Sequence, residues 1–89
     1  MQSRNKRPMT AAERRHVERV KDLPCVVCDA HGPSEAHEIE QGAWFLSVAC
    51  CPDCHRNPVL GIHGQKRAWL VRKMSELDAL NETLRRLAA

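Results

Sequence analysis

The stretch "CCPDCH", Cys50 to His55, and the earlier stretch "CVVC", Cys25 to Cys28, decide how this chain folds. Each holds two cysteines with two residues between them, the spacing with which a tight turn presents two thiolates to one tetrahedral zinc ion. Residues 29–50, 22 in all, separate the two pairs and leave room for a hairpin. We predict a structural zinc site whose four ligands are Cys25, Cys28, Cys51 and Cys54.

The fifth cysteine, Cys50, precedes the ligand Cys51 directly. In an extended chain two consecutive side chains point in opposite directions, so Cys50 is expected to be a small buried apolar residue. A ligand set that includes Cys50 remains an alternative at this stage.

A chain of 89 residues predicts one small domain with a thin core, for which a bound metal is a common source of stability. The first residues, "MQSRNKRPMT", are polar and lack the apolar stretch of a signal peptide. Clustered cysteines without such a segment predict a cytoplasmic protein that binds metal and forms no disulfides. The sequence contains no run of about eighteen apolar residues, so no membrane-spanning helix is expected.

The charges are segregated along the chain, although the net charge is only +3. Residues 1–21 carry seven Lys and Arg against two acids, residues 22–55 carry six acids and neither Lys nor Arg, and residues 56–89 carry seven bases against three acids. Basic segments of this kind favour DNA phosphates and low sequence specificity, although two solvated Arg-rich helices are the simpler alternative. The candidate phosphate-binding residues are Arg4, Lys6, Arg7, Arg14, Arg15, Arg56, Lys66 and Arg67.

Local patterns predict a small α+β domain over residues 10–89 after a basic flexible tail over residues 1–9. Thr10 and Glu13 have the spacing of a capping box that opens a helix over residues 10–23, before Pro24. Within the metal-binding core over residues 24–64, "EAHEIE" and "AWFLSVAC" predict a β-hairpin with a tight turn at Gln41–Gly42.

Leucines at steps of three and four predict a long helix over residues 65–87. Such a helix is about 35 Å long at 1.5 Å per residue, more than a domain of this size easily covers. Its apolar stripe is expected to pack against the hairpin, with homodimerisation as the alternative. The stripe consists of Leu70, Met74, Leu77, Leu80, Leu84 and Leu87.

Three histidines, His37, His55 and His63, remain around the hairpin once the four cysteines are assigned to zinc. Neutral imidazole is a common ligand of divalent metals, so together they predict a second metal site. The alternative is that each histidine is a structural residue.

The pattern "CVVC…AHEIE…ACCPDCHRNPVLGIHG", over residues 23–66, resembles the HNH, or His-Me finger, nucleases in their zinc-stapled phage and prophage form. The resemblance implies a ββα-metal core that holds a second divalent cation such as Mg²⁺, Mn²⁺ or Zn²⁺, and it implies hydrolysis of DNA in a bacterial host cell. The implied cation ligands are His37, His55 and His63.

Two positions depart from the family pattern. Glu38 stands where the family carries its general-base histidine, and Leu46 stands about where it carries an asparagine. Either Glu38 is the base, or His37 is the base while Glu35 or Glu40 reaches the metal, or the fold persists without catalysis. Consecutive strand residues face opposite sides, so His37 and Glu38 can share one site only where the strand twists or ends.

The leading interpretation is therefore an HNH-like DNA endonuclease or nickase, with Glu38 and His37 as catalytic residues and low sequence specificity. The alternative is a non-catalytic, zinc-stabilised phage DNA-binding or adaptor protein on a degenerate HNH scaffold. A third interpretation is a protein-interaction domain that uses its leucine stripe.

Overall fold

Thr10 starts the first helix, α1 (Ala11–Lys21), through the predicted capping box. The Thr10 hydroxyl accepts the backbone N–H of Glu13 at 3.1 Å, and the Glu13 carboxylate accepts that of Thr10 at 2.7 Å. These two bonds satisfy donors that the first turn of a helix leaves without partners. The helix buries Val17 and Val20 and ends three residues before Pro24.

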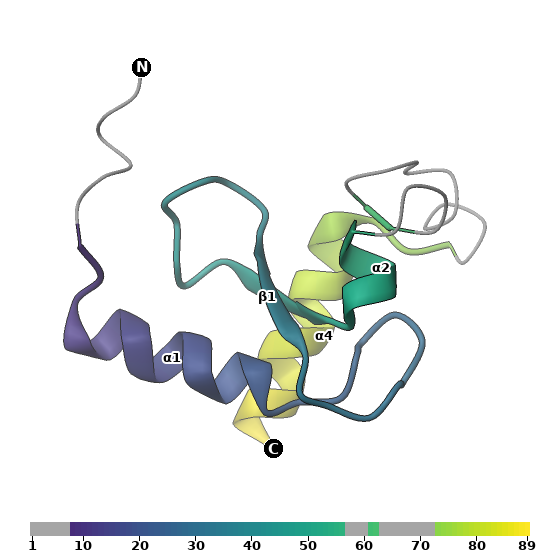
Figure 1. Cartoon of the computed structure of the whole chain (residues 1–89), viewed down its shortest axis with the longest axis horizontal. Coiled ribbons are helices and arrows are strands. Elements are labelled where there is room, and N and C mark those ends of the chain that lie inside the picture. The colour runs from purple at the N-terminus through teal and green to yellow at the C-terminus, as the bar shows by residue number, and fades with distance from the viewer. Residues whose placement is uncertain (1–7, 57–60, 63–72) are drawn as a thin grey trace.

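The computed structural model describes residues 8–56, 61–62 and 73–89. After α1 follow the strands β1 (Glu35–Glu38) and β2 (Ser47–Cys50), then the helices α2 (Pro52–Arg56) and α4 (Glu76–Ala88). The strands form an antiparallel sheet that contacts all three helices (Figure 1). These helices and the two-stranded sheet confirm the predicted α+β fold class. None of the helices in the described ranges is both long and apolar enough to cross a membrane.

The hairpin differs from the prediction in its connection. The turn at Gln41–Gly42 is present and is closed by the bond from the Ala43 N–H to the Glu40 carbonyl at 2.9 Å. It lies inside an eight-residue loop over residues 39–46, because the last strand pair is Glu38 with Ser47, so it does not join the two strands directly. Gly42 has a φ of 87°, and its N–H donates to the Glu38 carboxylate at 2.8 Å. This bond folds the chain back inside the loop, so the residues expected to extend both strands form successive turns.

The C-terminal helix also differs from the prediction. Lys73 has a φ of 57°, in the left-handed region, and Ser75 is the N-cap of α4. The Ser75 hydroxyl accepts the N–H of Asp78 at 3.0 Å, and the Asp78 carboxylate accepts that of Ser75 at 3.1 Å. The expected continuous helix over residues 65–87 is therefore wrong at residues 73–75, while residues 63–72 lie outside the described part.

Only part of the leucine stripe packs against the sheet. Leu80 is 8% exposed, whereas Leu77 is 67% and Leu84 is 39% exposed. The face of α4 toward β2 instead buries Ala79 and Thr83 completely. The Thr83 hydroxyl donates to the Ala79 carbonyl at 2.8 Å and accepts the Ala49 N–H at 3.2 Å. A small polar residue therefore joins the helix to the sheet.

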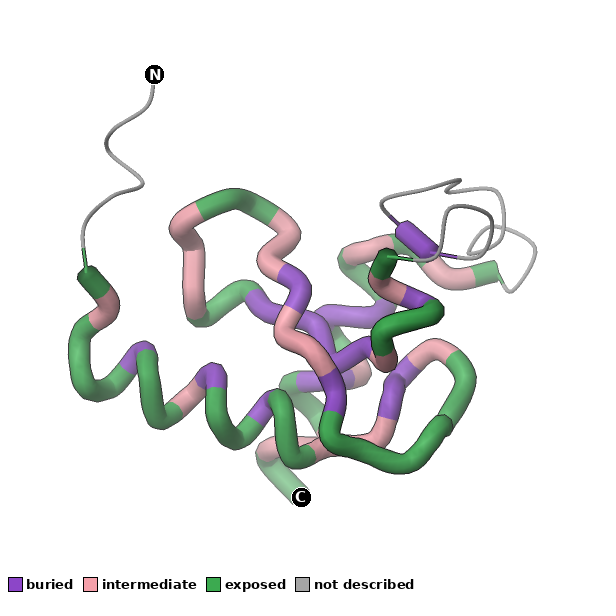
Figure 2. The backbone as a smooth tube through the Cα atoms, viewed as in Figure 1, coloured by how far each residue is buried: buried purple, intermediate pink, exposed green. Residues whose placement is uncertain are grey.

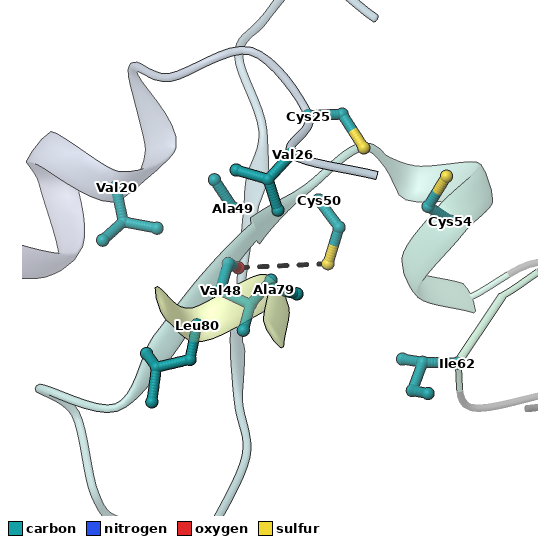
Figure 3. Packing of buried hydrophobic residues seen from close by; sticks show 10 residues of the cluster. All are labelled: Val20, Cys25, Val26, Val48, Ala49, Cys50, Cys54, Ile62, Ala79 and Leu80. Carbon is teal, nitrogen blue, oxygen red and sulfur yellow. Dashed lines mark hydrogen bonds between the residues drawn. The ribbon is translucent and has the colours of Figure 1, made fainter. Parts of the chain in front are cut away.

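The core lies around β2, whose four residues are all buried (Figure 2). Most of its members are small, and among the described residues the largest fully buried side chains are those of Val20, Val48 and Thr83. The buried cluster consists of Val20, Cys25, Val26, Val48, Ala49, Cys50, Cys54, Ile62, Ala79 and Leu80 (Figure 3). Because such side chains bury little apolar area, this core gains greatly from a metal crosslink.

Candidate metal centre

The four predicted zinc ligands meet at one end of the hairpin. Their sulfur atoms all lie within 4.8 Å of one another, and the Cys28 and Cys51 sulfurs are 3.7 Å apart. Zinc–sulfur bonds of about 2.3 Å in a tetrahedron place sulfurs about 3.8 Å apart. This sulfur cluster, which consists of Cys25, Cys28, Cys51 and Cys54, therefore fits a structural zinc ion.

Each cysteine pair is shaped by its own backbone. The N–H groups of Val27 and Cys28 both lie 3.4 Å from the Cys25 sulfur, and the Cys54 N–H lies 3.5 Å from the Cys51 sulfur. The first turn closes with Asp29 in the left-handed region, at a φ of 63°. These N–H donors stabilise the thiolate forms of Cys25 and Cys51, and each donor comes from the same cysteine pair as the sulfur that it contacts.

The ionisation of Cys25 follows from this arrangement. Burial alone would raise its pKa, but the backbone N–H groups of Cys51, Cys28 and Val27 outweigh burial, and the pKa lies below the ordinary cysteine value. Zinc binds the thiolate form, so the lowered pKa favours metal binding at this position.

Cys50 belongs to the core and lies outside the sulfur cluster. Its sulfur lies 3.9 Å from the Val48 carbonyl oxygen, as drawn in Figure 3, and burial raises the pKa of its thiol. The neutral thiol is therefore favoured at this position, as expected of a buried apolar residue. The structure therefore brings together the predicted four cysteines and does not support the alternative ligand set that includes Cys50.

Two predicted histidines lie together on the sheet and on α2. The rings of His37 in β1 and His55 in α2 have centroids 5.0 Å apart, with 64° between their planes. His37 is 5% exposed, and its Nε2 is 2.6 Å from Glu76. His55 Nδ1 is 2.8 Å from Glu35. We call these four residues the histidine cluster.

The third predicted cation ligand, His63, lies outside the described residues. Among the side chains that the structure describes, only the sulfur cluster brings three or more metal-binding groups close enough to share one ion. His37 and His55 are brought together, and their role as ligands of a second cation is a proposal.

Glu35 joins the histidine cluster to a neighbouring arginine. Its carboxylate accepts hydrogen bonds from both Nε and Nη2 of Arg56, the former at 3.0 Å. The hydrogen bond with His55, followed by that with Arg56, holds the pKa of Glu35 below its ordinary value. In the structure Glu35 bonds to these two partners, and its contact with a cation stays a prediction.

Glu38 is the last residue of β1, which meets the condition for sharing a site with His37. Both residues line an open hollow of about 360 Å³ together with His55 and Gln41. The same Glu38 carboxylate accepts the Gly42 N–H, so it also holds the loop. Glu40 is exposed in that loop.

The described phosphate-binding candidates are solvent-exposed. Arg14 and Arg15 lie on α1, and Arg56 ends α2 with its side chain 66% exposed beside Glu35. A second hollow of about 530 Å³ lies between Lys21 and Arg56 and shares His55 with the first. The candidates that lie outside the described residues are Arg4, Lys6, Arg7, Lys66 and Arg67.

Sequence reasoning missed Glu76 as a member of the histidine cluster. The pattern Ser75-x-x-Asp78 is a capping-box signal that places Glu76 at the first position of a helix. Nothing in the local pattern links Glu76 to His37, which lies 39 positions earlier.

Comparisons of this chain with protein-family models, with curated proteins and with solved structures found no match.

Proposed function

We propose that this protein is an HNH-like, metal-dependent DNA endonuclease or nickase with low sequence specificity. The observation that carries the proposal is the pairing of His37 and His55, whose ring centroids are 5.0 Å apart beside the sulfur cluster. The elements follow in the order strand, strand, helix, with one histidine on the first strand and one on the helix. This order agrees with the ββα-metal core that the sequence resembles.

In this proposal His37, His55 and His63 would hold a second divalent cation, such as Mg²⁺, Mn²⁺ or Zn²⁺. Imidazole nitrogens suit Zn²⁺ and related metals, and because they are neutral they leave the charge of the ion undiminished. When bound, the ion supplies positive charge that stabilises the negative charge developing on the phosphate and the leaving oxygen.

Glu38 is the proposed general base. It lines the same hollow as the two histidines, and its position at the end of β1 lets its carboxylate and the His37 ring border one space. In the reaction the Glu38 carboxylate accepts a proton from the attacking water. The Gly42 N–H at 2.8 Å holds this carboxylate in place. Removal of a general base typically slows a reaction by ~10²–10⁴-fold.

DNA binding is proposed to depend on phosphate contacts. The hollow between Lys21 and Arg56 adjoins the one lined by His37 and Glu38, so a strand that crosses both would pass cationic groups before it reaches the histidines. Arg14 and Arg15 on α1 add exposed positive charge. Contacts of this kind recognise the backbone and carry little base specificity, and they weaken as salt rises.

The test is a plasmid-nicking assay with Mg²⁺, Mn²⁺, Ni²⁺ or Zn²⁺, preceded by elemental analysis. We expect one tightly bound zinc per chain in the wild type and in every variant. Nicking should fall by ~10²–10⁴-fold in Glu38→Ala and should be lost in His37→Ala. Glu40→Ala, which removes an exposed carboxylate from the same loop, is the matched control and should nick normally. Zinc binding without nicking under any metal contradicts the proposal.

A second candidate is the non-catalytic DNA-binding or adaptor protein. The observation that favours it is the bond between Glu38 and Gly42, because that bond gives the carboxylate a purely structural use in the loop. This candidate predicts DNA binding that weakens steeply between low and moderate salt while the plasmid remains intact. Nicking that depends on Glu38 would exclude it.

A further inference from the structure

The N-terminal turn of α4 reaches the histidine cluster through one residue. Glu76 is the first residue of α4, and its Oε2 is 2.6 Å from Nε2 of His37 in β1. His37 is 5% exposed, so the partner of this ring nitrogen is chosen by the fold rather than by solvent. A buried imidazole N–H needs a hydrogen-bond acceptor, and the carboxylate provides one.

The position of Glu76 is set from two directions. The capping box between Ser75 and Asp78 defines where α4 begins, and so where its first residue stands. The bond from the Ala49 N–H to the Thr83 hydroxyl fixes the helix against β2, the strand that pairs with β1. A carboxylate at the first position of a helix also interacts favourably with the positive end of the helix dipole.

We propose that Glu76 is a positioning residue for His37, a role that rests on the proposed nuclease function. An ionised carboxylate can only accept hydrogen bonds, so the Glu76 contact selects the tautomer of His37 with its proton on Nε2. A histidine held in this way by a carboxylate keeps one tautomer and one ring orientation.

The neighbouring histidine, His55, contacts its carboxylate through the other ring nitrogen. His55 uses Nδ1 for its contact with Glu35 at 2.8 Å, whereas His37 uses Nε2 for its contact with Glu76. The two rings therefore use different nitrogens, and the tautomer of each is determined by a carboxylate from another element. The nitrogens that these two contacts occupy are a property of the packed fold, to which α4 contributes through Glu76.

The first arm of the test measures the tautomer directly, without any nuclease assay. The ¹⁵N shifts of the ring nitrogens are recorded on zinc-loaded protein at a pH well above the ordinary histidine value of ~6.5. We expect the His37 proton on Nε2 in the wild type and a mixture of tautomers in Glu76→Gln, because an amide can both donate and accept. Glu82→Gln on the same helix, whose carboxylate pairs with Arg85 and Arg86, is the matched control and should match the wild type.

The second arm measures nicking by the same variants after their zinc content and thermal unfolding have been compared. Loss of an outer-sphere partner of this kind typically costs 10–100-fold in activity or metal affinity, so Glu76→Gln should nick about 10–100-fold more slowly than Glu82→Gln. Glu76→Asp keeps the charge on a shorter side chain and should recover part of that loss.

The two arms separate failure of this proposal from failure of the proposed function. A His37 tautomer that is the same in the wild type and in Glu76→Gln overturns the positioning role, as does wild-type nicking by Glu76→Gln. A tautomer that changes in Glu76→Gln while even the wild type fails to nick supports the role of Glu76 and overturns the nuclease.

Discussion

The sulfur cluster and the histidine cluster lie close together in this protein, yet they are built in different ways. Each half of the sulfur cluster is made by four consecutive residues whose backbone N–H groups already face a sulfur. In the histidine cluster the two acid–histidine contacts span 20 and 39 positions along the chain. The lesson is that each cysteine pair is a local structure, although the two pairs meet across 23 positions, whereas no part of the histidine cluster forms before distant elements have packed.

The helix α4 touches both clusters. Its first residue, Glu76, contacts His37, and near its other end Arg86 donates to the Asp29 carboxylate at 3.1 Å, in the turn that follows Cys28. Changes in α4 should therefore disturb the histidine cluster strongly and the sulfur cluster weakly, because only the former takes a member from this helix.

The largest expected effect follows from loss of a sulfur ligand. Cys54→Ser should bind no zinc and show no cooperative unfolding, because structural zinc contributes ~10–16 kcal/mol in small domains, comparable to the ~5–15 kcal/mol total stability of most proteins. His37→Ala should keep both zinc and cooperative unfolding. Circular dichroism with elemental analysis measures both, and a folded, zinc-free Cys54→Ser would show that the sulfur cluster is dispensable.

Thr83→Val should weaken the link between α4 and the sheet. The change leaves the buried Ala49 N–H without its acceptor, at a cost of about 1–3 kcal/mol in the free energy of unfolding. For a domain of this size each kcal/mol lowers Tm by about 4–8 °C. Thr83→Ser, which keeps the hydroxyl, is the control. Zinc content should not change, so a loss of zinc in Thr83→Val would mean that the two clusters are not independent.

Cys50→Ala should have a smaller effect and should separate Cys50 from its neighbour. The buried thiol contributes packing alone, so its removal is expected to cost about 1 kcal/mol of unfolding free energy while one zinc per chain remains bound. Cys51→Ala is the comparison variant and should lose the metal. Urea titration measures the stability, and a Cys50→Ala protein without zinc would place Cys50 among the ligands.

The smallest effect concerns pH and the solvent-exposed face of α4. Hydrogen bonds from Arg85 and Arg86 hold the pKa of Glu82 below its ordinary value of 4.5. Because the folded pKa is the lower one, this contribution to stability is present above 4.5 and disappears as pH falls through the folded value. Glu82→Gln should therefore lose less stability than the wild type on acidification. Identical acid-unfolding curves would mean that these ion pairs contribute nothing measurable.

Several parts of the fold were predictable because their cause is local. Thr10 and Glu13 form the expected capping box, and the two cysteine pairs meet as their spacing predicts. The start of α4 was also predictable, since Ser75-x-x-Asp78 is the same capping-box signal. The leucine periodicity continues past this signal and therefore hides it. The hairpin loop could not be found in this way, because it depends on where the Glu38 carboxylate bonds.

By itself the sequence determined the α+β class, the two cysteine pairs of the sulfur cluster and the start of α1, and it favoured a buried Cys50, because each of these follows from residue types and spacings that can be read along the chain. The tertiary structure alone decided that β1 ends at Glu38 and that Glu76 meets His37. The physical reason is the range of the interactions. Turns and caps are short-range and leave a pattern in the chain, whereas a contact across 39 positions arises only when α4 packs against the sheet.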